Sequence, residues 1–198
     1  MPKPTFFNLA ESKRDKLMEA IHTEFSRVPL NEASISNIVK EADIARGSFY
    51  QYFSGKEDAF LYMLEQFAMD SKDVFLELTK EADGNLIAGL NAFFRRFLED
   101  IDGIDFIRNT FHNMNLQTEE VIQKIFKDEV EELRFEDVRS CVGGKYAKLS
   151  SEEFYYIMDI MLGVTVHNIL HKFGNRLEID TACEHYRREL ELLEHLVK

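Results

Sequence analysis

The sequence predicts an all-α protein, with about nine helices and no convincing strand. Only three prolines and nine glycines interrupt its 198 residues. The longest patterned segments place apolar residues every three or four positions, which is the spacing of an amphipathic helix. These observations favour a small N-terminal helical unit followed by a larger helical bundle.

The first expected helix begins near Asn8 or Ser12 and ends before Pro29. Each of the two starting residues is followed three positions later by an acid, Glu11 or Asp15, which is the spacing of a capping box. One apolar stripe then runs along the helix through Leu17, Ile21 and Phe25. This stripe predicts the face that packs against the next two elements.

Two short helices and a tight turn are expected between Ser34 and Phe53. Ser34 is a suitable cap for the first of them, whose apolar positions are Ile35, Ile38, Val39 and Ala42. The turn contains Asp43, and aspartate is one of the few non-glycine residues that tolerate a left-handed backbone. Helices under about 12 residues are marginal alone in water, so Phe49 and Phe53 should pack this unit against the first helix. Such a unit places one helix in the major groove of DNA.

The rest of the chain predicts one long helix followed by several others. Ser54 and Glu57 have capping-box spacing and open a helix that reaches about Asp83. Ser150 and Glu153 form a further pair of this kind. The later helices are expected over residues 85–101, 105–113, 118–140, 150–171 with Gly174 as the end, and 180–197 with Asp180 as the cap. We expect a helix-turn-helix domain over residues 1–56, with the connecting helix to about 66, and a second domain over 57–198.

The net charge of −12 is unevenly distributed along the chain. Residues 1–56 carry eight basic and seven acidic side chains, whereas residues 57–198 carry sixteen and twenty-nine. An acidic second domain would repel DNA, so phosphate contacts must come from the local geometry of the N-terminal unit. No leader pattern is present, and no apolar run approaches the ~18 residues of a membrane span, which favours a soluble, cytoplasmic protein.

The most specific pattern is Gly47-Ser48-Phe49-Tyr50-Gln51-Tyr52-Phe53-Ser54-Gly55-Lys56-Glu57, preceded by Ser34-Ile35 and Ile38-Val39-Lys40-Glu41-Ala42. This pattern closely resembles the helix-turn-helix signature of TetR-family transcriptional regulators. The resemblance covers about residues 10–66. It departs from the family pattern at Asp43, where glycine is usual, at Ala45, where serine commonly caps the recognition helix, and at Ser54-Gly55, where a basic pair is frequent.

The resemblance implies which side chains contact DNA. Tyr50, Tyr52 and Lys56 are expected to contact phosphates, and Arg46, Ser48 and Gln51 are expected to face the groove. Arginine and glutamine can pair bidentately with guanine and adenine edges, whereas phosphate contacts fix register without reading sequence. The expected surface also includes Ser34, Ser36, Asn37 and Gly47.

The second domain is expected to bind a ligand and to dimerise. Two DNA-binding units must reach successive major grooves, about 34–36 Å apart, and we expect a two-fold homodimer through residues 151–173 and 181–197. The density of aromatic residues motivates a largely apolar effector pocket. Its candidate residues are Phe67, Phe93, Phe97, Phe111, Met114 and Phe126. The resulting hypothesis is a repressor of a palindromic operator, released by a small apolar or aromatic effector.

Two other hypotheses of function remain open at this stage. The first is a helical regulator that acts through protein partners and has a weakened DNA-binding unit, and the second is a helical enzyme or carrier. No catalytic elbow, phosphate-binding loop or paired-cysteine motif occurs, so we expect no enzyme activity and no cofactor. His167 and His171 have i, i+4 spacing that could serve a metal, but a core or interface role is commoner, and no metal site is expected. Cys141 and Cys183 are expected to be reduced.

Overall fold

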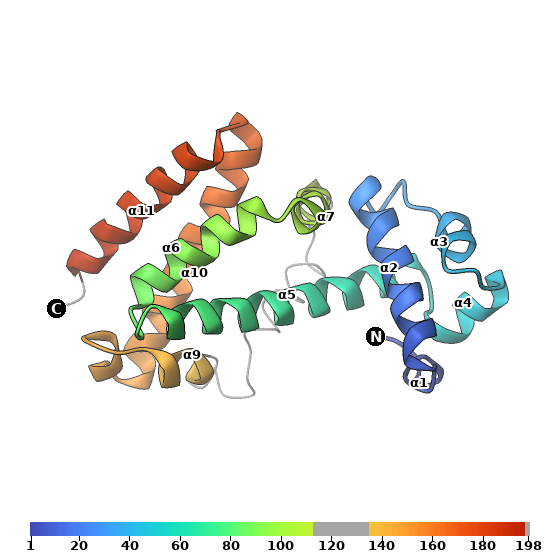
Figure 1. Ribbon diagram of the computed structural model, residues 1–198, viewed down its shortest axis with the longest axis horizontal. Helices are drawn as coiled ribbons and strands as arrows, with labels where there is room; N and C mark the ends of the chain where they lie inside the picture. The colour runs from blue at the N-terminus through green and yellow to red at the C-terminus, as the bar shows by residue number, and fades with distance from the viewer. Residues whose placement is uncertain (113–134, 197–198) are drawn as a thin grey trace. The chain divides into compact units, whose positions relative to one another are not determined.

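The computed structural model describes residues 1–112 and 135–196, and every regular element within these ranges is a helix (Figure 1). The described residues form two compact units. Residues 1–69 and 101–112 form the head unit, and residues 70–100 and 135–196 form the body unit. The all-α fold class predicted from the apolar spacing is confirmed. No helix in these ranges is both long and apolar enough to cross a membrane.

The head unit is organised around one central helix, α2. Its helices are α1 (Pro4–Phe7), α2 (Glu11–Arg27), α3 (Ile35–Glu41), α4 (Arg46–Tyr52), the first part of α5 (Lys56–Glu81) and α7 (Ile101–His112). α2 packs against both α3 and α7. Phe25, Phe49, Phe53, Phe60 and Phe106 are each at most 1% exposed. Burying one such ring stabilises by about 1.5–3 kcal/mol, so this aromatic core can hold α3 and α4, which are too short to be stable alone.

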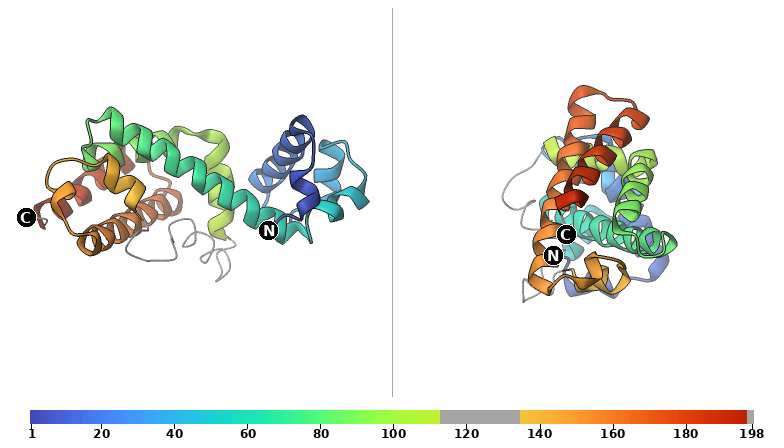
Figure 2. Two further views of the ribbon diagram at one scale, coloured as in Figure 1. Left: turned by 90° about the horizontal axis from the view of Figure 1, so that it is seen from below. Right: turned by 90° about the vertical axis from the view of Figure 1, so that its left-hand side faces the viewer.

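The body unit contains the remainder of α5 with α6 (Leu86–Glu99), α9 (Glu136–Cys141), the 3-10 helix η2 (Tyr146–Lys148), α10 (Ser151–Asn175) and α11 (Ile179–Leu196). α10 and α11 lie side by side (Figure 2). Tyr186 on α11 is fully buried, its ring stacks on Phe94 at 4.2 Å between centroids, and its hydroxyl lies 2.7 Å from the Thr165 hydroxyl on α10. These contacts join α6, α10 and α11 into one core.

The helix ends agree only in part with the expected capping residues. The capping box at Ser150 and Glu153 is present at the start of α10. The box expected at Asn8 or Ser12 is wrong, because Ala10 is the N-cap of α2 and forms no side-chain cap. The Ser54–Glu57 box is also wrong, since the Ser54 N–H donates to Asp58 Oδ2 at 2.9 Å.

The bounds of three later helices also differ from those expected. α10 continues through Gly174 and ends at Asn175, because Arg176 adopts the left-handed C-cap conformation with φ of 51°. α11 begins at Ile179, so Asp180 lies in its first turn rather than at its cap. α7 begins four residues before the expected start at residue 105. Of the helix expected over 118–140, residues 118–134 lie outside the described residues; in the remainder, the short helix α9 begins at Glu136 after its N-cap Phe135 and ends at Cys141.

Candidate DNA-binding site

α3 and α4 form a helix-turn-helix within the head unit. The two seven-residue helices pack against each other across a four-residue connection that begins at Ala42. Asp43 has a φ of 55°, as its expected tolerance of the left-handed region allows, and its carboxylate lies 3.8 Å from the Lys16 ammonium. The Ile44 N–H donates to Val39 O at 3.0 Å and closes the turn. This geometry leaves one face of α4 uncovered.

The predicted DNA-contacting side chains lie mainly on exposed surface of these helices. Ser36, Asn37, Arg46, Gly47, Tyr50 and Gln51 are exposed, whereas Ser34, Ser48, Tyr52 and Lys56 are half-buried. Arg46 Nη1 donates to Ser36 Oγ at 2.8 Å, so a side chain of α4 is linked to α3 across the turn. The space beside the Gly47 α-carbon is open, since nothing would touch a methyl group there. The surface can therefore approach a flat or grooved partner closely.

A groove beside α4 adds further basic groups to this surface. It has a volume of about 510 Å³ and is lined by residues of α2, the turn and α4, among them Lys13, Lys16, Ser48 and Tyr52. Lysine ammonium groups and tyrosine hydroxyls both suit phosphate oxygens. The groove thus places two lysines beside α4 in a chain whose net charge is −12, although Asp43, which also lines it, lies 3.8 Å from the Lys16 ammonium.

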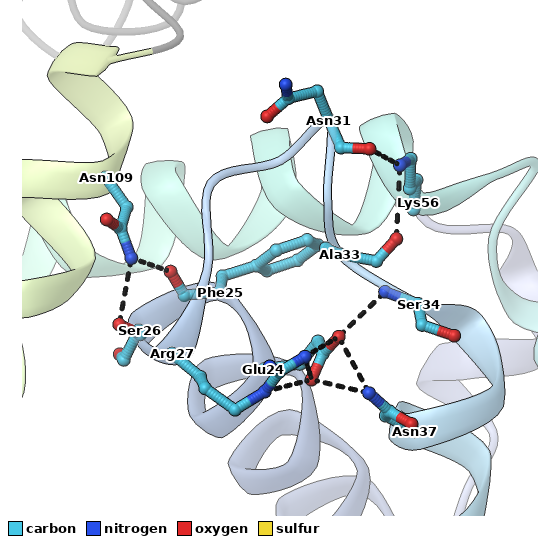
Figure 3. A network of polar contacts seen from close by, with 10 residues as sticks. All are labelled: Glu24, Phe25, Ser26, Arg27, Asn31, Ala33, Ser34, Asn37, Lys56 and Asn109. Atoms are coloured by element: carbon cyan, nitrogen blue, oxygen red, sulfur yellow. Dashed lines mark hydrogen bonds and ion pairs between the residues drawn. The ribbon is translucent and has the colours of Figure 1, made fainter.

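A buried carboxylate holds the start of α3. Glu24 on α2 is 4% exposed, and it accepts the Ser34 N–H at 2.7 Å and the Asn37 carboxamide N–H at 3.2 Å (Figure 3). It also accepts bidentately from Arg27, at 3.0 and 2.8 Å. The Ser34 side chain forms no cap, so Glu24 supplies from another helix the anion that favours a helix N-terminus.

Two further side chains fix the same region of the head. The Lys56 ammonium donates to the carbonyl oxygens of Asn31 at 2.9 Å and Ala33 at 3.1 Å (Figure 3). The buried Asn109 carboxamide on α7 donates to the carbonyl oxygens of Phe25 at 3.0 Å and Ser26 at 2.8 Å. Lys56 therefore ties the α2–α3 loop to α5, and Asn109 ties the end of α2 to α7.

Sequence reasoning missed Glu24 and Asn109. A signal for Glu24 was available, because it lies three residues after Ile21 and seven after Leu17, on the predicted buried stripe. A charged residue on a buried stripe needs polar partners, so its position predicts a hydrogen-bonded role in the core. For Asn109 no such signal exists, since its partners are backbone carbonyls more than eighty residues away.

The predicted effector residues are distributed over both compact units. Phe67 and Phe111 belong to the head, where the Phe67 ring lies 5.6 Å from that of Phe106. Phe93 and Phe97 are neighbours on α6 in the body, with ring centroids 6.0 Å apart. Met114 and Phe126 lie outside the described residues.

The body unit contains an apolar cavity of about 70 Å³. Of the four effector candidates that the structure describes, Phe93 alone lines it. The other lining residues include Phe75, Leu90, Phe135, Met158 and Leu162. Lys72 also lines it, and its ammonium pairs with Asp137 on α9. The surface inside the cavity is almost entirely carbon, so it suits an apolar occupant.

On α10, His167 is exposed and His171 is half-buried. The rings of His167 and His171 stack 6.0 Å apart, and the His185 ring of α11 is 6.1 Å from His171. Across the described ranges, no group of three or more His, Cys, Asp or Glu side chains is arranged to hold a metal ion. The histidines therefore belong to the outer surface of the α10–α11 pair.

The two-helix unit with its exposed α4 defines the class of this chain, a helix-turn-helix DNA-binding protein. Residues 17–63 match the model of bacterial regulatory proteins of the tetR family, and residues 85–195 match the tetracyclin repressor-like C-terminal domain. The chain belongs to the TetR family of transcriptional regulators, which are DNA-binding and non-enzymatic.

Solved structures share this fold over nearly the whole chain. A TetR-family regulator from Streptomyces coelicolor matches with a TM-score of 0.67 at 19% identity, covering 96% of this chain and 83% of that one. A TetR regulator from Rhodococcus sp. RHA1 matches with a TM-score of 0.62 at 18% identity, covering 95% and 99%.

One curated relative matches over a shorter segment. The uncharacterized HTH-type transcriptional regulator YvdT of Bacillus subtilis is 45% identical over 56 residues, which is 28% of this chain. The match spans about a quarter of the relative's length, 26%.

Proposed function

We propose that this protein is a repressor that acts in the cytoplasm and reads a palindromic operator with α4. The observation that carries the proposal is the uncovered face of α4, where Arg46 and Gln51 are exposed beside the tyrosines Tyr50 and Tyr52. Arginine and glutamine are suited to base edges, and tyrosine hydroxyls to phosphates. Ser34, Ser36, Asn37, Gly47 and Ser48 complete the proposed surface.

The test begins with selection of a duplex from fragmented genomic DNA by the wild-type protein. Gln51→Ala or Arg46→Ala should then change the preferred sequence, because each removes a proposed base contact. Lys56→Ala should weaken all sequences alike and reduce the salt slope of binding by about one unit. If affinity fell while the slope stayed unchanged, Lys56 would act only through its hold on the Asn31 and Ala33 carbonyls.

Failure to select any duplex would contradict operator binding and favour the alternative function. In that alternative, the protein regulates through protein partners and its head holds DNA weakly. The acidity of residues 57–198, with sixteen basic against twenty-nine acidic side chains, is the observation that favours it. Capture of a partner protein by a variant with Arg46→Ala and Gln51→Ala would then be expected.

We further propose that two copies pair through α10 and α11. Tyr156, Ile160, Gly163, His167 and Leu170 are exposed and follow one another at spacings of four and three, which is one face of a helix. Leu192 and Leu196 on α11 are 68% and 75% exposed. Glycine at 163 leaves open space beside the helix, so a second helix can approach its backbone.

The dimer proposal is tested by placing a charge on this face. Ile160→Glu should yield a monomer in sedimentation and lower operator affinity at least about tenfold, because one short recognition helix binds weakly. Ala147→Glu on η2 adds the same charge to exposed surface outside α10 and α11 and should change neither property. A wild-type monomer that binds the operator with full affinity would contradict the proposal.

We also propose that the effector is a small apolar or aromatic molecule held in the body cavity. The cavity volume is about 70 Å³, whereas an engineered cavity of ~150 Å³ holds benzene. An effector must therefore enlarge the space, for instance by moving Phe93 or Leu162. Such a movement would distinguish a DNA-binding state from a released state of the protein. A ligand shifts the equilibrium between these two states only if it binds one of them more tightly, typically by about 1–3 kcal/mol.

A screen of small aromatic and aliphatic compounds tests this effector class. A hit should raise the melting temperature and release the operator. Leu162→Phe should fill the cavity and abolish the response while leaving operator binding intact. A hit that still acts on Leu162→Phe would place the effector elsewhere, with Phe67, Phe97, Phe111, Met114 and Phe126 as the remaining candidates.

A further inference from the structure

The C-terminal end of α4 is completed by residues that precede α2. An α-helix leaves its last four carbonyl groups without partners of its own. The Phe53 N–H donates to Phe49 O at 2.9 Å, which serves the first of the four. The Lys3 ammonium donates to Tyr50 O at 2.8 Å, the Thr5 hydroxyl donates to Gln51 O, and the Lys3 N–H donates to Tyr52 O at 2.8 Å. Lys3 and Thr5 thus serve the other three.

The segment that carries Lys3 and Thr5 is itself anchored. Pro2 is buried, and Phe6 in α1 is 0% exposed. The Phe6 ring lies 5.2 Å from that of Phe53, immediately after α4, and 5.3 Å from that of Tyr62 on α5. Two anchoring residues therefore flank the two donors, so Lys3 and Thr5 are held at the end of α4 by apolar packing.

This arrangement matters because α4 has only seven residues. A helix of this length has three carbonyl-to-amide bonds in its interior, and its stability depends on the groups at its ends. A lysine at a helix C-terminus also complements the negative end of the helix dipole. The three carbonyls involved belong to Tyr50, Gln51 and Tyr52, whose side chains form the C-terminal part of the proposed recognition surface.

We propose that Lys3 and Thr5 are positioning residues for DNA recognition. They cap α4 and hold the backbone that carries Tyr50, Gln51 and Tyr52 in the orientation that fits the major groove. The proposal rests on the proposed function in one respect, namely that α4 is the helix that reads DNA. Lys3 acts here through a carbonyl of α4 rather than through a phosphate.

Hydrogen–deuterium exchange of the free protein tests the cap without DNA. The variant Lys3→Met with Thr5→Val keeps Pro2 and Phe6 but removes both side-chain donors. Exchange of the amides in residues 50–53 should accelerate about fivefold or more, because two hydrogen bonds to the end of the helix are lost. Lys13→Met, which removes a lysine from α2 instead, should leave these amides unchanged. Equal exchange in the double variant and the wild type would overturn the proposal.

Binding to the duplex selected by the wild-type protein tests the consequence for recognition. The double variant should bind about five- to thirtyfold more weakly, with a melting temperature lowered by no more than about 8 °C, and its salt slope should equal that of the wild type. Lys3→Arg with Thr5→Ser keeps both donors and should restore affinity and exchange. A slope reduced by about one unit would mean that Lys3 contacts a phosphate, which contradicts the positioning role.

The two measurements separate this proposal from the proposed function. If the wild-type protein selects no duplex while the double variant still exchanges faster in α4, DNA reading by α4 is wrong and the cap stands as a property of the fold. If the wild-type protein selects a duplex and the double variant binds it with full affinity, the positioning role is wrong and the proposed function is unaffected.

Discussion

Replacement of the buried Glu24 by glutamine tests how the recognition unit is held together. Glu24→Gln keeps the shape of the side chain but removes its charge and turns one acceptor into a donor. In the wild type both oxygens receive N–H groups, from Arg27, from Asn37 and from the Ser34 backbone. The new amide N–H₂ must therefore face a donor, wherever it points.

The expected cost follows from the number and exposure of these partners. Loss of charge assistance at the Ser34 N–H and a donor–donor conflict at Asn37 together cost about 2–3 kcal/mol. Arg27 is 53% exposed, so its ion pair contributes at most about 1 kcal/mol and its guanidinium can return to water. For a chain of this size, 1 kcal/mol lowers the melting temperature by about 2–4 °C, which predicts a fall of about 4–12 °C.

Urea denaturation followed by circular dichroism measures the free energy, and hydrogen exchange of residues 35–41 reports the start of α3. Arg27→Met is the matched control, because it removes the exposed partner and leaves the Ser34 and Asn37 bonds in place. Arg27→Met should lower the unfolding free energy by at most about 1 kcal/mol. A Glu24→Gln protein within about 0.5 kcal/mol of the wild type, or less perturbed than Arg27→Met, would refute the argument.

Three further predictions concern other parts of the fold. Asn109→Leu removes the donor shared by two carbonyls at the end of α2 and should lower the unfolding free energy by about 1–3 kcal/mol in urea; unchanged stability would contradict the proposed tie between α7 and α2. Gly89→Ala should lower the unfolding free energy by about 1–3 kcal/mol, because its methyl group would lie 2.3 Å from Thr79 Oγ1 and 2.9 Å from Thr79 Cα. Adding Thr79→Ala should recover part of that loss, and no recovery would mean that the strain lies elsewhere. Burial, with a smaller contribution from Glu194, raises the pKa of Tyr146 from 10.0 to about 12. The folded state therefore keeps a proton that the unfolded chain loses, so this contribution to stability is present below pH 10 and disappears as the pH rises towards 12. Tyr146→Phe should remove that part of the alkaline loss in denaturation curves, and should be nearly neutral at pH 7 because its hydroxyl has no hydrogen-bond partner among the described residues.

The helices of this fold were predictable from local signals where a strong periodic pattern was present, and in one case from a capping pair. The capping box at Ser150 and Glu153 and the helix after Ser34 are examples. α1 was not predicted, because four residues that include a proline carry no periodicity, and tertiary contacts of Phe6 stabilise it. The Ser54–Glu57 box failed because Asp58, one position later, takes the Ser54 amide.

The candidate site was predictable to the level of a helix face and no further. The residues expected on the surface of α3 and α4 are exposed or half-buried, since a short helix against a core has only one outward side. The internal bonds of Asn37 and Lys56 could not be predicted, because their partners lie on another helix and in a loop. Periodicity likewise assigned the aromatic residues to buried faces without indicating which compact unit each face would join.

The inclusion of α7 makes the head a discontinuous unit of the sequence. The ring of Phe106, which is 0% exposed, contacts those of His22, Phe60 and Phe67, and Asn109 holds the end of α2. A fragment cut after residue 69 would leave these partners facing water. During synthesis, the chain from Met1 to the end of α5 emerges before the helix that completes its core, and at about 5–20 residues per second this delay lasts several seconds. The nascent head therefore has an interval in which its aromatic surface is open to chaperones, and a minimal DNA-binding fragment must extend to His112.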